Sequence, residues 1–208
     1  MPLQNRVTPF GEIVALAGRG TLMGNRGVVH DEARRIVRPW QVRRWIACRT
    51  EFRGRRREVM PPRRWTALFF LDEAAAFAAG HRPCAECRNA DYRCFRALWE
   101  GVHGGPGGAD AIDRVLHAQR TDGRRKRTYR ARLGALPDGA YVALDGAAWL
   151  VQGAELLEWT DRGYGRRRAR PPDRAADVLT PPGIVAVLAA GYGATVHPSA
   201  YATGESSG

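Results

Sequence analysis

Four cysteines carry the clearest chemistry in the sequence, and two of them, Cys84 and Cys87, lie close together in the segment HRPCAECR. A Cys-x-x-Cys turn allows two thiolates to hold one tetrahedral metal ion, because the backbone of the turn folds around both sulfurs. A redox-active dithiol would need a βαβ setting, whereas the preceding residues 72–79 form an alanine-rich helical pattern that Gly80 should end. The spacing therefore favours zinc over a redox pair.

A longer pattern surrounds this turn. The residues that carry it, in order, are Phe69, Phe70, Glu73, Ala74, Gly80, Arg82, Pro83, Cys84, Cys87 and Arg88. This pattern resembles the C-terminal half of the Ada-type zinc-binding domain of bacterial methylphosphotriester DNA repair proteins. Upstream, RRWIACR resembles the strand that carries the first zinc cysteine of that family, with Cys48 and Arg49 in the matching places. The match covers about residues 42–90, and the whole chain is also similar to a bacterial family of about this length.

The resemblance implies that Cys48, Cys84 and Cys87 bind zinc, and that Cys48 stands where the family has its methyl-accepting thiolate. The sequence departs from the family at one place, because Phe52 stands where the second cysteine of a four-cysteine site would lie. A zinc ion with fewer thiolates carries less negative charge, and neighbouring arginines reduce its nucleophilicity further. A structural zinc is therefore favoured over methyl transfer.

A fourth zinc ligand must come from elsewhere, unless the position is open to water. His30 is the favoured candidate, because it lies on a separate segment that is free to fold over the site. His81 could reach only through a tight loop, and Cys94 lies about two helical turns after Cys87, which is far for one ion. Cys94 is more simply explained as a small buried side chain on a helix.

The charge of the chain is strongly uneven. The 208 residues carry a net charge of +12, and all but one of the 33 basic side chains are arginines. Residues 1–133 hold 27 basic and 13 acidic side chains, whereas residues 134–208 hold 6 and 8. Two basic runs stand out, residues 43–64 and residues 124–132, which indicates a surface that binds a polyanion. The predicted nucleic-acid contacts are Arg49, Arg53, Arg55, Arg56, Arg57, Arg124, Arg125, Lys126 and Arg127.

Two weaker patterns could also contact phosphate. His117 and Arg120 lie three residues apart on one predicted helical face, where they could serve as an acid or base and a clamp; a half-buried histidine beside a solvent-facing arginine is the favoured alternative. The glycine-rich segment 18–27 fits no nucleotide-binding fingerprint, although its Arg19, Asn25 and Arg26 could approach a phosphate closely, with a plain irregular turn as the equal alternative. Three tryptophans flank the arginine-rich stretch, Trp40, Trp45 and Trp65, and they are expected in the core, with base stacking by one of them as the alternative.

The remaining patterns predict an α+β fold with an Ada-like N-terminal domain, a small C-terminal β-rich module and a terminal helix. Residues 1–100 form the arginine-rich zinc domain, 101–110 a Gly/Pro loop, 111–133 a helix and basic arm, 134–202 the β module with its helix, and 203–208 a disordered tail. Strands are expected within 136–160, an arginine- and proline-rich loop after them, and then a helix capped by Thr180 and ended by Gly191.

The sequence therefore predicts a cytoplasmic bacterial zinc protein that binds nucleic acid, DNA rather than RNA, with a possible link to DNA repair. No apolar run is long enough to span a membrane, and no protein partner is evident. The alternative is an enzyme, either a methyl acceptor through Cys48 or a metal-assisted phosphodiesterase that uses His30 and His117. In that case Cys48, His117 and Arg120 are the catalytic candidates.

Overall fold

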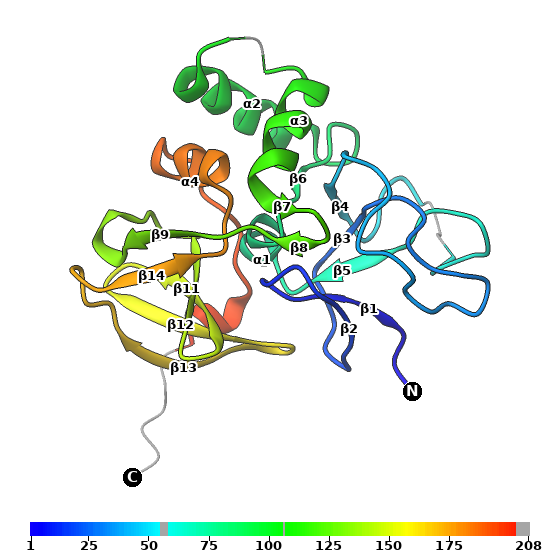
Figure 1. The fold of residues 1–208 in the computed structure, drawn as a ribbon, viewed down its shortest axis with the longest axis horizontal. Helices are drawn as coiled ribbons and strands as arrows, with labels where there is room; N and C mark the ends of the chain where they lie inside the picture. The colour runs from blue at the N-terminus through cyan, green and yellow to red at the C-terminus, as the bar shows by residue number, and fades with distance from the viewer. Residues whose placement is uncertain (55–57, 106, 203–208) are drawn as a thin grey trace.

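The computed structural model describes residues 1–54, 58–105 and 107–202. In these residues the chain forms two six-stranded sheets, a two-stranded ribbon and four α-helices (Figure 1). The predicted α+β class is therefore confirmed. A search of the same residues finds no helix that is long and apolar enough to cross a membrane.

Residues 4–83 contribute the first sheet, whose strand order is β2-β1-β5-β3-β4-β6. Its strands are β1 (Gln4–Val7), β2 (Ile13–Ala15), β3 (Leu22–Asn25), β4 (Ile46–Arg49), β5 (Leu68–Phe70) and β6 (Arg82–Pro83). The central strand β5 buries Leu68 and Phe70 against Val29 and Ala47. At one edge of the sheet, β4 and β6 run parallel to each other.

Helix α1 (Glu73–Ala78) has a capping residue at its start and the predicted glycine after its end. The side chain of Asp72 accepts a hydrogen bond from the Ala75 amide at 2.8 Å, as an N-cap does. Gly80 follows with a φ of +87°, a conformation that glycine adopts most readily. All six helical residues are buried, and α1 lies between the two large sheets (Figure 1).

Two amphipathic helices follow, α2 (Asn89–His103) and α3 (Ala109–Arg120), separated by the predicted Gly/Pro loop. Their apolar faces bury Phe95 and Trp99 of α2 and Leu116 of α3 in the larger core. Gly108 occupies the N-cap position of α3 and makes no side-chain hydrogen bond.

The second large sheet has the strand order β13-β12-β11-β10-β14-β9. Its strands are β9 (Tyr129–Arg132), β10 (Tyr141–Leu144), β11 (Ala147–Gln152), β12 (Glu155–Thr160), β13 (Gly163–Ala169) and β14 (Ala175–Val178). The ribbon of β7 (Thr121–Asp122) and β8 (Arg125–Lys126) precedes it, and a short 3₁₀ helix η1 (Leu133–Ala135) follows β9. The strands expected within 136–160 are therefore present.

The loop predicted after residue 160 is wrong, because β13 and β14 occupy most of it. Arginines occupy strand positions here because each has a partner on another strand of the same sheet. Arg166 forms an ion pair with Glu158 of β12 at 2.6 Å, and the Arg168 guanidinium lies 4.0 Å from the ring centre of Trp149. Such cross-strand pairs stabilise a sheet without the apolar alternation that marks most strands in a sequence.

The C-terminal helix α4 (Pro182–Ala189) is followed by Gly191 with a φ of +103°, as predicted. The predicted Thr180 cap is wrong, because Pro181 is the N-cap residue and the Thr180 hydroxyl accepts a hydrogen bond from the Tyr141 amide. A final 3₁₀ helix, η2 (Pro198–Ala200), leads to the end of the described chain. The predicted disordered tail, residues 203–208, lies outside the described residues.

The N-terminal and C-terminal halves share buried polar contacts as well as apolar ones. Asp72 accepts a hydrogen bond from the Tyr164 hydroxyl at 2.6 Å and another from the His197 amide at 2.8 Å. Glu73 accepts from the Tyr192 hydroxyl and from the Thr195 amide. Asp72 and Glu73 therefore connect the start of α1 to the second sheet and to the C-terminal segment through buried hydrogen bonds.

Candidate metal centre

Three cysteines meet where β4 and β6 run side by side. Cys48 lies on β4, and Cys84 follows β6 directly. The register pairs Ala47 with Pro83, and the Cys84 amide donates to the Ala47 carbonyl at 3.0 Å. The turn after Cys84 then returns Cys87 to the same place, so parallel pairing brings together residues that are more than 30 positions apart.

The three Sγ atoms lie within 4.8 Å of one another, and this group could hold a metal ion. Cys48, Cys84 and Cys87 are buried, with 4%, 7% and 6% of their surface exposed. Sulfurs about 3.8 Å apart are expected around a tetrahedral zinc with Zn–S bonds of about 2.3 Å. The thiol donor set and its compactness therefore fit zinc.

The charge environment of the three thiols is uneven. The Cys48 thiol and nearby backbone amides donate hydrogen bonds to Cys84 and lower its pKa to about 5. The hydrogen bond to Cys84, burial and the charge on Cys84 raise the pKa of Cys48 far above its usual range. Burial also raises the pKa of Cys87, although the Arg49 amide donates to its sulfur at 3.4 Å. One thiolate is thus favoured by the protein alone, and further thiolates need a cation.

An apolar shell surrounds the cysteines. Met23 and Ala67 are buried with them, and Phe52, Trp65 and Phe69 pack against this cluster. Phe52 occupies the sequence position where the Ada pattern has its remaining cysteine. The side chain at this position therefore supplies packing, and it cannot donate an electron pair to a metal.

The predicted fourth ligand, His30, is not brought to the cysteines. Its Nδ1 lies 2.6 Å from the Thr66 hydroxyl and its Nε2 lies 3.2 Å from the Pro61 carbonyl oxygen, so both ring nitrogens have other partners. The structure therefore does not place His30 in the group of residues that could hold a metal ion.

The other two candidates also lie apart from the thiols. His81 is fully buried, and its Nε2 accepts a hydrogen bond from Arg26. Cys94 is exposed on α2, so its expected burial is wrong. Among the described residues, the group of possible metal ligands thus consists of Cys48, Cys84 and Cys87.

The predicted nucleic-acid contacts separate into three groups. Arg49, Arg53, Arg124, Arg125 and Arg127 are exposed, although Arg127 lies 3.8 Å from Asp122 in an ion pair. Lys126 turns inward, and its ammonium donates to the backbone carbonyl of Ala78. Arg55, Arg56 and Arg57 lie outside the described residues.

The structure also brings His117 and Arg120 together at the end of α3. Nη2 of Arg120 lies 3.5 Å from Nδ1 of His117, whose ring packs edge-on against Trp40. The expectation that Arg120 faces solvent is wrong, since only 1% of its surface is exposed. Arg120 is buried by contacts with residues distant in the sequence, Gly80 and Arg43 among them, so no local sequence pattern indicated its burial.

Two arginines of the Ada-like pattern have internal partners. Arg82 donates to both carboxylate oxygens of Asp113 on α3, at 3.0 and 2.7 Å, and Arg88 donates to Glu73 at 2.7 Å. All four side chains are buried. These arginines therefore hold the cysteine turn against α3 and α1.

Comparisons of the chain with protein-family models, with curated proteins and with solved structures found no match.

Proposed function

We propose that Cys48, Cys84 and Cys87 bind zinc, and that the zinc stabilises the fold of a protein that binds nucleic acid, DNA rather than RNA. The observation that carries this proposal is the group of three buried thiols within 4.8 Å of one another. Buried thiols in one group are costly when ionised alone, and zinc removes that cost.

The nucleic-acid part of the proposal is supported by charge. Arg49 directly follows Cys48 and is exposed, as is Arg53, so two cations lie on the chain close to the centre. Most of the basic excess also belongs to residues 1–133. The Ada-like pattern, a family pattern of DNA repair proteins, favours DNA and a link to repair.

Burial favours a structural zinc over a methyl-accepting one. Only 4% of the Cys48 surface is exposed, and Phe52 packs against the cysteine cluster. A phosphotriester would have to reach this sulfur for methyl transfer. The phosphodiesterase alternative is weakened too, because His30 contacts Thr66 and Pro61 whereas His117 contacts Trp40 and Arg120.

Zinc content tests the metal centre. We expect about one zinc per chain in the purified wild type by elemental analysis, and loss of zinc in Cys84→Ser. His30→Ala should keep its zinc, since His30 has other partners. A wild type that lacks zinc and reacts with a thiol reagent at all four cysteines would refute the metal proposal.

Fluorescence anisotropy with a labelled DNA duplex and the matching RNA duplex tests the partner. Binding should weaken steeply with salt, because each arginine that contacts a phosphate releases counterions. Replacing Arg49 and Arg53 by glutamine should reduce the slope of log K against log salt by about 1 per residue. Arg162→Gln, an exposed arginine of the C-terminal half, is the matched control. Salt-insensitive binding, or equal slopes for all variants, would contradict the proposal.

A further inference from the structure

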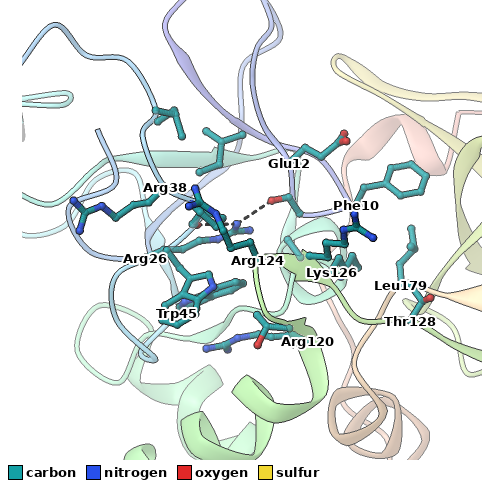
Figure 2. Close-up of a pocket in the computed structure, with 18 of the residues that line it drawn as sticks. Phe10, Glu12, Arg26, Arg38, Trp45, Arg120, Arg124, Lys126, Thr128 and Leu179 are labelled. Carbon is teal, nitrogen blue, oxygen red and sulfur yellow. Dashed lines mark hydrogen bonds between the residues drawn. The ribbon is translucent and has the colours of Figure 1, made fainter. Parts of the chain in front are cut away.

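A cavity of about 670 Å³ lies between the first sheet, the end of α3 and the second sheet. The acidic residues in its lining are Glu12 and Asp177. Six cationic side chains also line it: Arg26, Arg38, Arg120, Arg124, Arg125 and Lys126. Figure 2 shows Arg26, Arg120, Arg124 and Lys126 converging on this space from different segments. The cavity therefore combines a strongly basic lining with enough room for an organic molecule.

Trp45 organises the base of this cavity. The guanidinium of Arg26 lies 4.1 Å from the Trp45 ring centre, and that of Arg120 lies 4.0 Å from it (Figure 2). Only 1% of the surface of each arginine is exposed. The indole thus separates two buried cations and holds their planar groups in place, which is the preorganisation that a binding site requires.

The two guanidiniums keep hydrogen-bonding capacity unused. Nη1 of Arg26 donates to the Gly11 carbonyl at 2.9 Å, and its Nε donates to His81 at 3.4 Å, but its buried Nη2 has no partner. Gly11 lines the cavity. A Cβ placed on Gly11 would lie 3.8 Å from Nη2 of Arg26 and 4.0 Å from Cδ of Lys126. Nη2 therefore lies beside the cavity lining with a donor to offer.

Arg120 and Lys126 complete the cationic cluster. Arg120 donates to the carbonyl oxygens of Gly80 and Arg43, and its buried Nε has no partner. The half-buried Lys126 donates to the Ala78 carbonyl. Within the described part of the chain, none of Arg26, Arg120 and Lys126 forms an ion pair with a carboxylate.

The missing carboxylate is informative, because buried arginines elsewhere in this protein have one. Arg82 is paired with Asp113 and Arg88 with Glu73. In the cavity, burial lowers the pKa of Arg26 to about 9. Burial and the charge of Arg26 lower the pKa of Arg120 to about 9, and burial with the charges of both arginines lowers that of Lys126 to about 7. A dianion that entered the cavity would relieve this repulsion and accept the unused donors.

We propose that this cavity binds a phosphomonoester, through Arg26, Arg120 and Lys126 around Trp45. A phosphate dianion matches a cluster of three cations, and its oxygens accept the forked donors of arginine. The apolar side chains Phe10, Ile13, Val37 and Leu179 also line the cavity, so an organic group attached to the phosphate would have a surface to pack against. This site is separate from the cysteine centre and from the exposed arginines of the proposed function.

Calorimetric titration of the full chain in phosphate-free buffer tests the site, with inorganic phosphate, phenyl phosphate and adenosine 5′-monophosphate as probes. We expect both organic phosphates to bind, more tightly than inorganic phosphate, because they also fill the apolar part. Lys126→Met should weaken their binding at least about tenfold, since it removes a charged donor but keeps the length of the side chain. The matched control is Arg127→Met, which removes a neighbouring cation that does not line the cavity. This variant should bind like the wild type.

The source of the phosphate is distinguished by single-stranded oligonucleotides with a 5′-phosphate or a 5′-hydroxyl. If the ligand is the 5′ end of a strand, the phosphorylated strand should bind at least as tightly as the mononucleotide. Lys126→Met should then remove the advantage of the phosphorylated strand over the hydroxyl strand. A free mononucleotide as ligand predicts tight binding of the nucleotide and no difference between the strands. Both results support the cavity as a phosphomonoester site.

Absence of binding of all three small probes at 10 mM, or equal binding by wild type and a folded Lys126→Met, would overturn the proposal. If Lys126→Met fails to fold, protection of tryptophan fluorescence from acrylamide by phenyl phosphate in the wild type serves instead, because Trp45 lies between the two arginines. No protection would then refute it. Zinc content and duplex binding are measured on the same samples, so failure of the proposed function is seen separately.

Discussion

The cysteine centre and the cationic cavity lie at opposite ends of the same two parallel strands. Trp45 precedes β4 and Cys48 lies on it, while His81 precedes β6 and Cys84 follows it. A separation of three residues corresponds to about 10 Å along a strand. One end of the pair thus gathers groups that become anions, and the other end gathers cations.

The two regions share one physical property, which is that each buries ionisable groups of one kind close together. The Arg82–Asp113 pair, which lies between them, has its partner within the chain. Burying an unpaired charge is costly, so a fold that retains such a charge must recover the cost elsewhere. Zinc at one end and a phosphate dianion at the other would each provide the missing charge.

Removal of the metal ligand should have the largest effect on stability. Cys84→Ser removes the thiol with the lowest pKa of the three and, with it, the zinc. We expect the melting temperature to fall by at least about 10 °C, because structural zinc contributes several kcal/mol to folding. Chelator treatment of the wild type should reproduce the fall, whereas Cys94→Ser should leave the melting temperature unchanged, since Cys94 is exposed and apart from the centre. An unchanged melting temperature in Cys84→Ser would show that the cysteine centre does not stabilise the fold.

Breaking the internally paired charge should have the next largest effect. Arg82→Met leaves Asp113 buried without its partner, which costs about 3–5 kcal/mol. Urea denaturation measures this loss. The matched control is Arg96→Met, which breaks an exposed pair with Glu100 and should cost less than about 1 kcal/mol. Equal losses of unfolding free energy in the two variants would show that burial of the Arg82–Asp113 pair does not raise the cost of breaking it.

The ligand-free cavity should make stability depend on pH. The pKa of Lys126 is about 7 in the folded protein, lowered by burial and by Arg26 and Arg120, whereas an unfolded lysine titrates near 10.4. Between these values the unfolded chain binds more protons, so stability should rise as pH rises from 7, while the penalty is fully present below pH 7. Glu12 and Asp177 are the acidic residues among the described lining of the same cavity.

Melting temperatures between pH 6.5 and 8.5 measure this dependence below the range in which the two arginines titrate. Lys126→Met should show a smaller rise than the wild type, and saturating phenyl phosphate should also reduce it. Identical profiles for the wild type and Lys126→Met would show that Lys126 keeps its ordinary pKa.

The smallest expected effect concerns the position of the missing cysteine. Phe52→Cys adds a thiol beside the cysteine cluster, against which Phe52 packs. A fourth thiolate should tighten zinc binding by about tenfold, or about 1.4 kcal/mol. Competition with a chromogenic chelator measures the change, with Phe52→Ser as the control for lost packing. Equal zinc affinity for Phe52→Cys and Phe52→Ser would show that this position does not face the metal.

Local signals predicted much of the fold. Helix α1 ends before the predicted glycine, and α3 and the strands β10 to β12 lie where apolar periodicity and turn residues indicated. The prediction was wrong at β13, where arginines occupy strand positions because Glu158 of β12 and Trp149 of β11 are their partners in the sheet. A sequence pattern does not show the cross-strand neighbour that makes a charged residue acceptable in a sheet.

The sequence by itself determined the features that depend on neighbours along the chain: the Cys-x-x-Cys turn, the helix before it and the excess of arginine. Only the tertiary structure decided that His30 stays away from the thiols and that Arg26, Trp45, Arg120 and Lys126 meet in one cavity. These four residues span 100 positions and come from three separate segments. Their meeting depends on how the sheets and α3 pack, and residue spacing carries no record of that packing.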